Sequence, residues 1–160
     1  MRSSIFLFEN DVWKPINAMN PTVAIYLWIA LGGALGSLAR FALGGWLQRG
    51  LESRLPVLLG FPVGTILVNV TGSFVIGLLA SLKAAGGESL LPPPLRLFLL
   101  VGVCGGYTTF SSFSLETLQL ADKGEWTRAG VNVLGSVAVC LLAVWLGHAL
   151  ALAFNKTRGV

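Results

Sequence analysis

The segment GGYTTFSSFS, residues 105–114, places two glycines, two threonines and three serines inside an otherwise apolar run. Gly105 and Gly106 can adopt backbone angles that other residues resist, so we expect an α-helix to break there. Irregular backbone at membrane depth is tolerated only where it is buried in protein or lines a cavity. The freed carbonyls and the Thr108 hydroxyl are hard oxygen ligands suited to a small cation. The segment therefore predicts a cation site, which two copies of the chain can share.

Polar side chains recur four residues apart in two neighbouring apolar segments. Thr65, Asn69 and Ser73 share one helix face in VGTILVNVTGSFVIG. Asn132 and Ser136 repeat the spacing in RAGVNVLGSVAVC. Such donors either hold helices together, at about 0.6 kcal/mol per bond, or form a track that replaces the water around an ion. The spacing leaves both interpretations open, and it leaves the sign of the ion open.

Two phenylalanines follow the polar segment at helical spacing. Phe110 and Phe113 are three residues apart and share a face in a helix. An aromatic ring has a negative face and a positive edge. Ring edges turned toward a pore would attract an anion weakly without trapping it, whereas rings turned inward would simply fill a core.

Three ionisable residues lie within or near the apolar segments, and such groups are functional hypotheses by default. Arg40 either extends its charge to the interface or biases a vestibule toward anions. Glu116 either pairs with a cation or exchanges a proton, and we assign Arg40 and Glu116 to a vestibule. His148 lies near the end of the last apolar segment and is expected at the membrane interface.

The composition indicates which elements carry these residues. The 160-residue chain is 54% hydrophobic and only 11% charged, whereas soluble domains average about 25% charged residues. A helix needs roughly 20 apolar residues to cross a bilayer. We expect an all-α membrane protein with a broken third helix, and transmembrane helices near 23–47, 62–83, 95–120 and 128–153.

The short loops leave no room for a soluble catalytic module, and we do not expect an enzyme. No nucleophile–base pair or metal-ligand cluster stands out in the sequence. The net charge of +4 comes from helix ends, so nucleic acid is not an expected partner. We expect one domain over 19–156. Residues 1–18 lack the layout of a signal peptide and are either a disordered tail or the product of an upstream start, with Met19 as the alternative start.

Small residues and cysteines give further expectations about packing. Cys104 and Cys140 fall in different helices and are expected as small buried residues that do not meet. Glycines four apart let helix backbones approach closely, and three such pairs occur: Gly32 and Gly36, Gly60 and Gly64, and Gly102 and Gly106.

The Lys and Arg counts give little preference for one orientation. Four spans put both termini on one side, which carries Arg2, Lys14, Lys83, Arg96, Lys156 and Arg158. The other side carries Arg49, Arg54, Lys123 and Arg128. Because orientation follows an excess on one side, the chain can insert both ways, and two oppositely inserted copies can form an antiparallel dimer. A small bias that fixes one orientation is the alternative.

Four segments, in order, resemble the CrcB/Fluc fluoride channel family. They are GALGSLAR, GTILVNVTGSF, VGVCGGYTTFSSFSLET and RAGVNVLGSVAVCLLAVWLG, and the similarity covers about residues 24–150. The third segment is the most specific. Some members have tyrosine where Asn132 aligns, which leaves the role of that position open.

The resemblance implies a dual-topology homodimer in the bacterial inner membrane that exports fluoride passively through two pores. It implies a structural sodium ion at the dimer centre, held by backbone oxygens of Gly105 and Thr108 from both subunits. The remaining matched positions are Asn69, Phe110 and Phe113 along each pore, Thr109, Ser112 and Ser136 in a polar track, and Arg40 near the aqueous entrance.

Two other functions are compatible with the same composition. A small dual-topology, proton-coupled multidrug exporter usually needs a buried carboxylate in its path, and Glu116 is the only nearby acid. Proton-coupled uptake of a cationic dye would favour that function. A structural membrane subunit would carry no ion flux at all.

Overall fold

The computed structural model describes residues 20–84 and 86–159, so the expectations for residues 1–18 and Met19 lie outside the described part. Four helical segments in this part are long and apolar enough to span a membrane, which confirms the predicted number. The described elements are α1 (Pro21–Arg54), the 3₁₀ turn η1 (Pro56–Leu58), α2 (Val63–Ser81), α3 (Pro93–Arg96), the π-helix η2 (Leu97–Cys104), α4 (Gly105–Tyr107), α5 (Phe110–Asp122) and α6 (Trp126–Thr157). The third span is a composite of α3, η2, α4 and α5.

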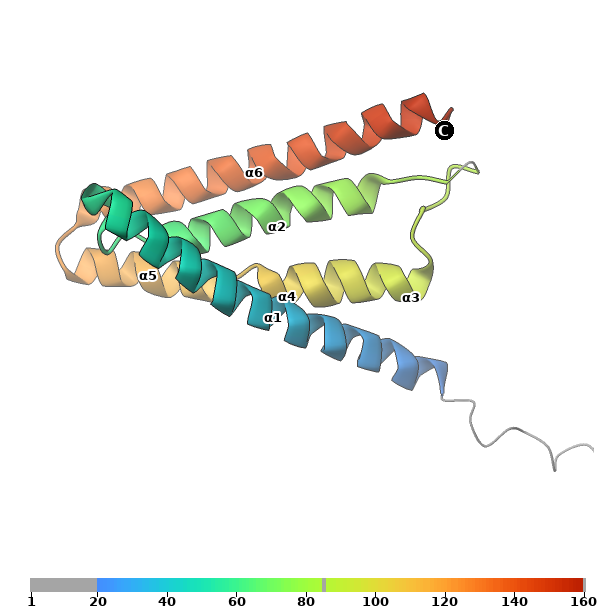
Figure 1. The fold of residues 1–160 in the computed structure, drawn as a ribbon, viewed down its shortest axis with the longest axis horizontal. Coiled ribbons are helices and arrows are strands. Elements are labelled where there is room, and N and C mark those ends of the chain that lie inside the picture. The colour runs from blue at the N-terminus through green and yellow to red at the C-terminus, as the bar shows by residue number, and fades with distance from the viewer. Residues whose placement is uncertain (1–19, 85, 160) are drawn as a thin grey trace, which may run out of the picture.

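The four spans form an elongated bundle (Figure 1). α2 and α6 run side by side, and α1 crosses obliquely over the third span. The α1–α2 and α5–α6 connections lie at one end, and the α2–α3 connection and the C-terminus lie at the other. The chain is therefore a multi-pass membrane protein whose crossings alternate in direction.

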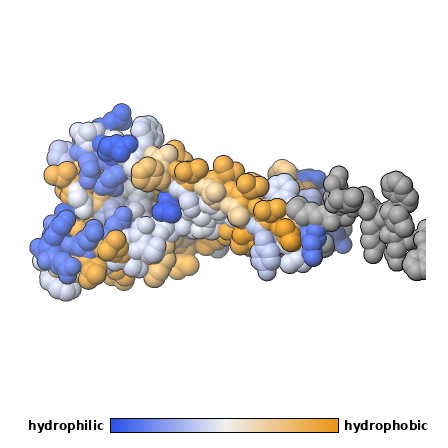
Figure 2. Space-filling view, turned by 90° about the horizontal axis from the view of Figure 1, so that it is seen from below, coloured by the Kyte–Doolittle hydropathy of each residue, from blue (hydrophilic) through white to orange (hydrophobic). Residues whose placement is uncertain are grey.

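The surface matches a bilayer environment. Figure 2 shows apolar side chains over the middle of one long face and hydrophilic side chains gathered mainly at the end that carries the α1–α2 and α5–α6 connections. Large apolar side chains on α1 are open to the surroundings, including Phe41 at 82% and Leu38 at 66%. Hydrocarbon chains are the surroundings in which such exposure is stable.

Local hydrogen bonds set the helix ends. Asn20 caps α1, since its Oδ1 accepts from Thr22 N at 2.9 Å. α2 lacks a capping side chain of its own because Pro62 occupies the N-cap position. Gln48 of α1 replaces it, and its Oε1 accepts from Gly64 N at 2.7 Å.

Glycines allow α1 to lie against the third span within one chain. A Cβ on Gly32 would come within 2.9 Å of Gly102 Cα, and one on Gly36 would come within 2.8 Å of Tyr107 N. A Cβ on Gly106 would come within 3.0 Å of Gly33 Cα. The pairs Gly32–Gly36 and Gly102–Gly106 thus serve a helix contact inside the chain.

The pairing of Gly60 with Gly64 on a helix face is wrong. Gly60 has φ +71° and nothing within 4 Å of where its Cβ would lie, so it belongs to the turn before α2. The left-handed backbone favours glycine there. Only Gly64 packs closely, with its Cβ position 3.2 Å from the Gln48 Cβ.

Substituting Gly147 is expected to destabilise the bundle. An alanine Cβ there would lie 2.8 Å from Leu78 N and would also meet Phe74 O, both of them backbone atoms of α2. Overpacking of this kind costs about 1–3 kcal/mol, so Gly147→Ala should lower the thermal unfolding midpoint in detergent. Gly135→Ala is the matched control, because α6 leaves open space around Gly135. Equal midpoints for the two variants would contradict this packing.

Candidate functional site

The third span changes conformation at two threonines. Helix α4 ends at Tyr107, and α5 begins at Phe110. Thr108 (φ −80°, ψ 156°) and Thr109 (φ −151°, ψ 120°) are extended. Gly105 is helical (φ −64°, ψ −37°) and Gly106 lies within α4, so the expectation that these glycines themselves form the break is wrong in position.

The threonine hydroxyls satisfy the helix ends on both sides of this segment. Thr108 donates to Cys104 O through its backbone N at 3.0 Å and through its Oγ1 at 2.9 Å. Thr109 is the N-cap of α5, and its Oγ1 accepts from Ser112 N at 3.2 Å. Threonine at an N-cap takes a helical donor that would otherwise lack a partner. The adjacent residues Thr108 and Thr109 therefore terminate α4 and cap the start of α5.

Asn69 of α2 holds the extended backbone from the side. Its Nδ2 donates to Thr109 O at 3.1 Å, and its Oδ1 accepts from Thr109 N at 2.7 Å. The carboxamide thus pairs with both backbone groups of one residue, as a neighbouring strand would. This contact supplies partners for backbone groups that a continuous helix would have paired internally.

The carbonyls around the extended segment are satisfied unequally. Gly106 O accepts from Arg40 Nε at 3.2 Å, and Ser37 Oγ lies 3.5 Å from the same oxygen. Gly105 O, Tyr107 O and Thr108 O accept no hydrogen bond from any residue that the structure describes. Three carbonyl oxygens near the one that Arg40 contacts therefore have no donor among the described residues.

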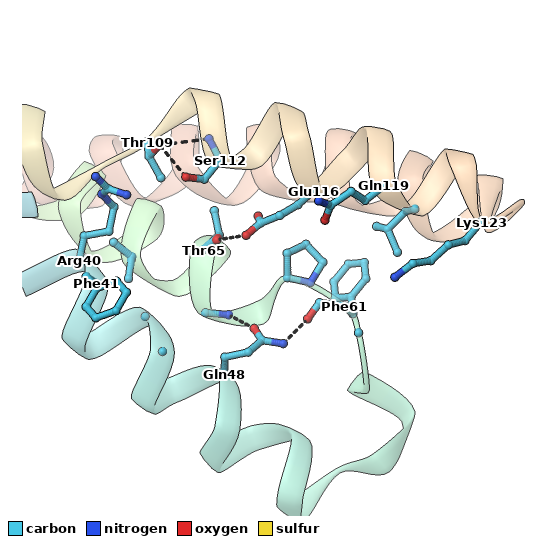
Figure 3. A pocket seen from close by; sticks show the side chains of 17 residues that line it. Arg40, Phe41, Gln48, Phe61, Thr65, Thr109, Ser112, Glu116, Gln119 and Lys123 are labelled. Atoms are coloured by element: carbon cyan, nitrogen blue, oxygen red, sulfur yellow. Dashed lines mark hydrogen bonds between the residues drawn. The ribbon is translucent and has the colours of Figure 1, made fainter.

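A first cavity of about 340 Å³ opens toward the α1–α2 connection (Figure 3). Gln48 and Phe61 lie on its loop side, and Thr109 and Ser112 lie at its inner end. Its charged lining residues are Arg40, Glu116 and Lys123. The cavity thus combines two cations and one carboxylate with hydroxyl donors, which suits a water-filled vestibule.

Glu116 is only partly satisfied within this cavity. Thr65 Oγ1 donates to Glu116 Oε1 at 2.7 Å. Glu116 Oε2 is buried and has no hydrogen-bond partner among the described residues. A buried polar atom without a partner is rare, and Glu116 Oε2 is the only buried side-chain oxygen or nitrogen of this kind among the described residues.

A second cavity of about 300 Å³ lies beside the extended segment. Its polar lining comes from α2, the third span and α6: Asn69, Ser73, Thr108, Thr109 and Ser136. Phe110 and Phe113 border it, with ring centroids 5.3 Å apart and planes inclined by 44°. Phe113 is buried, whereas Phe110 is 77% exposed. Thr109 borders both cavities and is therefore their common wall.

Asn132, whose role the sequence leaves open, links α5 to α6. Its side chain is 1% exposed. Its Nδ2 donates to Thr117 Oγ1 at 2.8 Å, and its Oδ1 accepts from Ser136 Oγ at 3.2 Å. Thr117 in turn donates to Phe113 O at 2.7 Å. A continuous chain of hydrogen bonds thus runs from the second cavity into α5.

The two cavities together contain every site residue expected from the sequence. The first is lined by Arg40, Thr109, Ser112 and Glu116, and the second by Asn69, Gly105, Thr108, Thr109, Phe110, Phe113 and Ser136. Cys104 and Cys140 are free thiols that both border the second cavity, and no disulfide joins them. Cys104 is buried as expected, whereas the expectation is wrong for Cys140, which is only half-buried. His148 of α6 is exposed, and its Nδ1 lies 2.8 Å from the Oγ of Ser81 at the end of α2.

Sequence reasoning missed several lining and supporting residues. Gln48 donates to Phe61 O and to Glu52 Oε1, both at 2.8 Å, and thereby fixes the loop that borders the first cavity. Lys123 borders the same cavity from the end of α5. Only the i, i+4 spacing of Gln48 and Glu52 pointed to a contact, and nothing in the sequence pointed to the loop as its target.

Known proteins are similar to this sequence over most of its length. The family model described as CrcB-like protein, Camphor Resistance (CrcB), matches residues 27–148. The chain belongs to the CrcB family. The membership expected from the four sequence segments is thereby confirmed.

CrcB-family relatives carry a common name. "Fluoride-specific ion channel FluC" of Opitutus terrae is 51% identical over 137 residues, which cover 86% of this chain and 99% of the relative. Proteins of the same name from Methylocella silvestris and Paramagnetospirillum magneticum are 50% and 48% identical. They cover 84% and 82% of this chain, and 98% of each relative is matched. Similarity therefore extends across all four membrane spans.

Proposed function

We propose that this CrcB-family chain is a fluoride-specific ion channel rather than an enzyme, and that it lies in a bacterial inner membrane. The observation that carries the proposal is Thr109, which borders both donor-lined cavities in a chain half identical to relatives named fluoride-specific channels. A path past Thr109 gives an anion hydrogen-bond donors on both sides of the extended segment. Passive flow through such a path would export fluoride from a cell that has accumulated it.

The chemistry of the lining supports an anion of high hydration energy. Fluoride loses its water only where hydrogen-bond donors replace it, and amide and hydroxyl groups of Asn69, Ser112 and Ser136 are at hand. The edges of the Phe110 and Phe113 rings add weak positive charge. Conduction needs several weak sites rather than one deep site, and these groups are dispersed over two cavities.

We propose that two copies assemble as an antiparallel dimer with two pores. The second cavity brings hydroxyls and an exposed Phe110 to the side of an apolar bundle. Polar groups facing hydrocarbon are unfavourable, so a second copy is expected to cover this side. The near-equal numbers of Lys and Arg on the two sides favour insertion in both directions.

A structural sodium ion at the dimer centre fits the donor set. No group of three or more His, Cys, Asp or Glu side chains in the described residues could hold a metal. Gly105 O and Thr108 O, by contrast, have no hydrogen-bond partner there. Both are hard oxygen donors of the kind that small cations prefer. We propose that these carbonyls from both copies hold the ion, which would add positive potential beside the pores.

Removing sodium is expected to loosen the assembly. A ligand that binds only the folded state stabilises it by an amount that grows with the logarithm of its free concentration above the dissociation constant. Exchange of sodium for N-methyl-D-glucamine, at constant ionic strength, should therefore lower the thermal unfolding midpoint of the detergent-purified protein by several degrees, and added sodium should restore it. A midpoint that is indifferent to the cation would remove sodium from the proposal.

Fluoride release from proteoliposomes tests the function directly. Vesicles loaded with potassium fluoride and reconstituted with the purified chain are diluted into fluoride-free buffer, and an electrode records release after valinomycin is added. Rapid fluoride release, with little chloride release from matched chloride-loaded vesicles, is expected. Equal release of both ions, or release of neither, would overturn the proposal.

Glu116→Gln separates the channel from a proton-coupled exporter. The substitution keeps an acceptor for Thr65 and removes the only side chain in the first cavity that could carry a negative charge. A channel should then pass fluoride at least as fast as the unmodified protein. A proton-coupled exporter would lose uptake of a cationic dye through the same change, because its essential carboxylate would be gone.

A further inference from the structure

We propose that Asn132 is a positioning residue that competes with a bound anion for the hydroxyl proton of Ser136 and thereby keeps anion binding in the second cavity weak. The inference rests on the proposed function, in which the second cavity lies on the anion path. It assigns a role to a side chain that lines neither cavity itself.

The hydrogen bonds around Asn132 have a fixed direction. Phe113 O can only accept, so the single proton of the Thr117 hydroxyl points to it across 2.7 Å. Thr117 Oγ1 must then accept from Asn132, which places the Nδ2 donor on that side at 2.8 Å. The Asn132 Oδ1 acceptor consequently faces Ser136, whose only proton it receives at 3.2 Å.

In this arrangement the Ser136 hydroxyl presents its oxygen, and not its proton, to an anion in the second cavity. With its proton committed to Asn132, Ser136 offers the second cavity only oxygen lone pairs. An anion is bound only if the O–H group turns toward it. The turn leaves Asn132 Oδ1 without its partner in a side chain that is 1% exposed, where water cannot replace the bond.

An anion can replace Asn132 Oδ1 as the acceptor of the Ser136 proton, but it then binds with reduced affinity. A hydrogen bond to a charged acceptor is stronger than one to a neutral carboxamide. The bond to Asn132 is lost in the same step and subtracts from the gain. Weak binding of this kind suits a pore, because an ion that binds too tightly does not leave.

A double-mutant cycle tests this role. Asn132→Leu keeps the branched shape and the number of side-chain heavy atoms and removes the competing acceptor, and Ser136→Ala removes the contested proton. The half-saturating fluoride concentration for flux into proteoliposomes should fall about tenfold in Asn132→Leu, which corresponds to one hydrogen bond, and the maximal rate should fall with it. In the Ser136→Ala background, Asn132→Leu should leave the half-saturating concentration unchanged. An unchanged or raised value in the single variant, or the same shift in both backgrounds, would overturn the inference.

A second variant covers the case in which Asn132→Leu does not fold. Thr117→Val keeps Asn132 but removes the acceptor that fixes its amide, so Nδ2 is free to turn and donate to Ser136. The half-saturating fluoride concentration should again fall, and an unchanged value in a folded Thr117→Val protein would count against the inference.

Fluoride-dependent stabilisation separates this inference from the proposed function. The thermal midpoint of purified protein is measured in sodium fluoride against sodium chloride, a readout that needs no conduction. A larger fluoride-specific increase in Asn132→Leu, present only with Ser136, supports the inference even if the unmodified protein carries no flux. If the protein conducts fluoride but its thermal midpoint shows no Ser136-dependent shift, the inference about Asn132 is overturned and the proposed function stands.

Discussion

Replacing Asn69 by leucine is expected to reduce fluoride flux by about tenfold or more, equivalent to at least ~1.4 kcal/mol in the barrier. The change removes both bonds to Thr109 and leaves the Thr109 N–H and C=O without partners. Each unsatisfied buried group costs about 1–3 kcal/mol. The extended backbone between α4 and α5 should then relax, and the wall shared by the two cavities should lose its shape. Electrode-recorded efflux from proteoliposomes measures the loss.

Thr71→Ala is the matched control for Asn69. Thr71 lies on the same helix, and its hydroxyl bonds Leu67 O at 2.8 Å and lies 3.0 Å from Tyr107 Oη, outside both cavities. Its removal deletes polar contacts but keeps Thr109 clamped, so flux should stay within about twofold of the unmodified rate, as for most surface changes. Wild-type flux in Asn69→Leu, with the protein folded, would show that this clamp does not matter for conduction.

Replacing Phe110 by isoleucine should also reduce flux about tenfold or more, with little change in the stability of the single chain. Phe110 is 77% exposed, so its ring contributes little to the core of one copy. Isoleucine keeps an apolar side chain but removes the positive ring edge that we propose for the anion path. The efflux assay, combined with a thermal unfolding midpoint, separates a loss of conduction from a loss of folding.

Phe154→Ile supplies the comparison for Phe110. Phe154 lies on α6 at 47% exposure, under the Arg158 guanidinium and away from both cavities. The same chemical change there should leave fluoride efflux intact. If both variants conduct normally, the ring of Phe110 has no part in the pore.

The membrane spans were predictable because helices that lie in lipid are rich in apolar residues and poor in charged ones. The apolar segments predicted four helices near 23–47, 62–83, 95–120 and 128–153, and the structure has matching spans. Their ends differ most for α1 and α6, which continue to Arg54 and Thr157. The α1 extension carries a charged side chain that contacts a loop, since Glu52 Oε1 accepts from Gly60 N at 2.9 Å. Hydrophobicity cannot reveal a helix that continues beyond the hydrocarbon.

The candidate site was predictable in its members and not in their contacts. Polar residues inside apolar runs identified the lining, since such residues need a reason to be there. The sequence could not show that Asn69 pairs with the Thr109 backbone, or that Arg40 reaches Gly106 O. Both contacts join segments at least 40 residues apart and depend on how α1 and α2 pack against the third span.

The position of the extended segment shows the same limit. Glycine permits many backbone angles and does not require an irregular one. Here the absence of a side chain at Gly106 allows α1 to approach, while the adjacent threonines provide the capping oxygens. Glycine propensity alone placed the break at Gly105 and Gly106. The tertiary contact with α1 determined the conformation that this segment adopts.

The reversal potential in a planar bilayer tests the central claim most directly. Purified protein is incorporated with fluoride on one side and an equal concentration of chloride on the other, and the voltage of zero current is measured at equal pH and with a pH gradient. A passive fluoride-specific channel predicts a large reversal potential of the sign set by the fluoride gradient, unaffected by the pH gradient. A reversal potential near zero, or one that follows the proton gradient, would contradict fluoride-specific passive conduction.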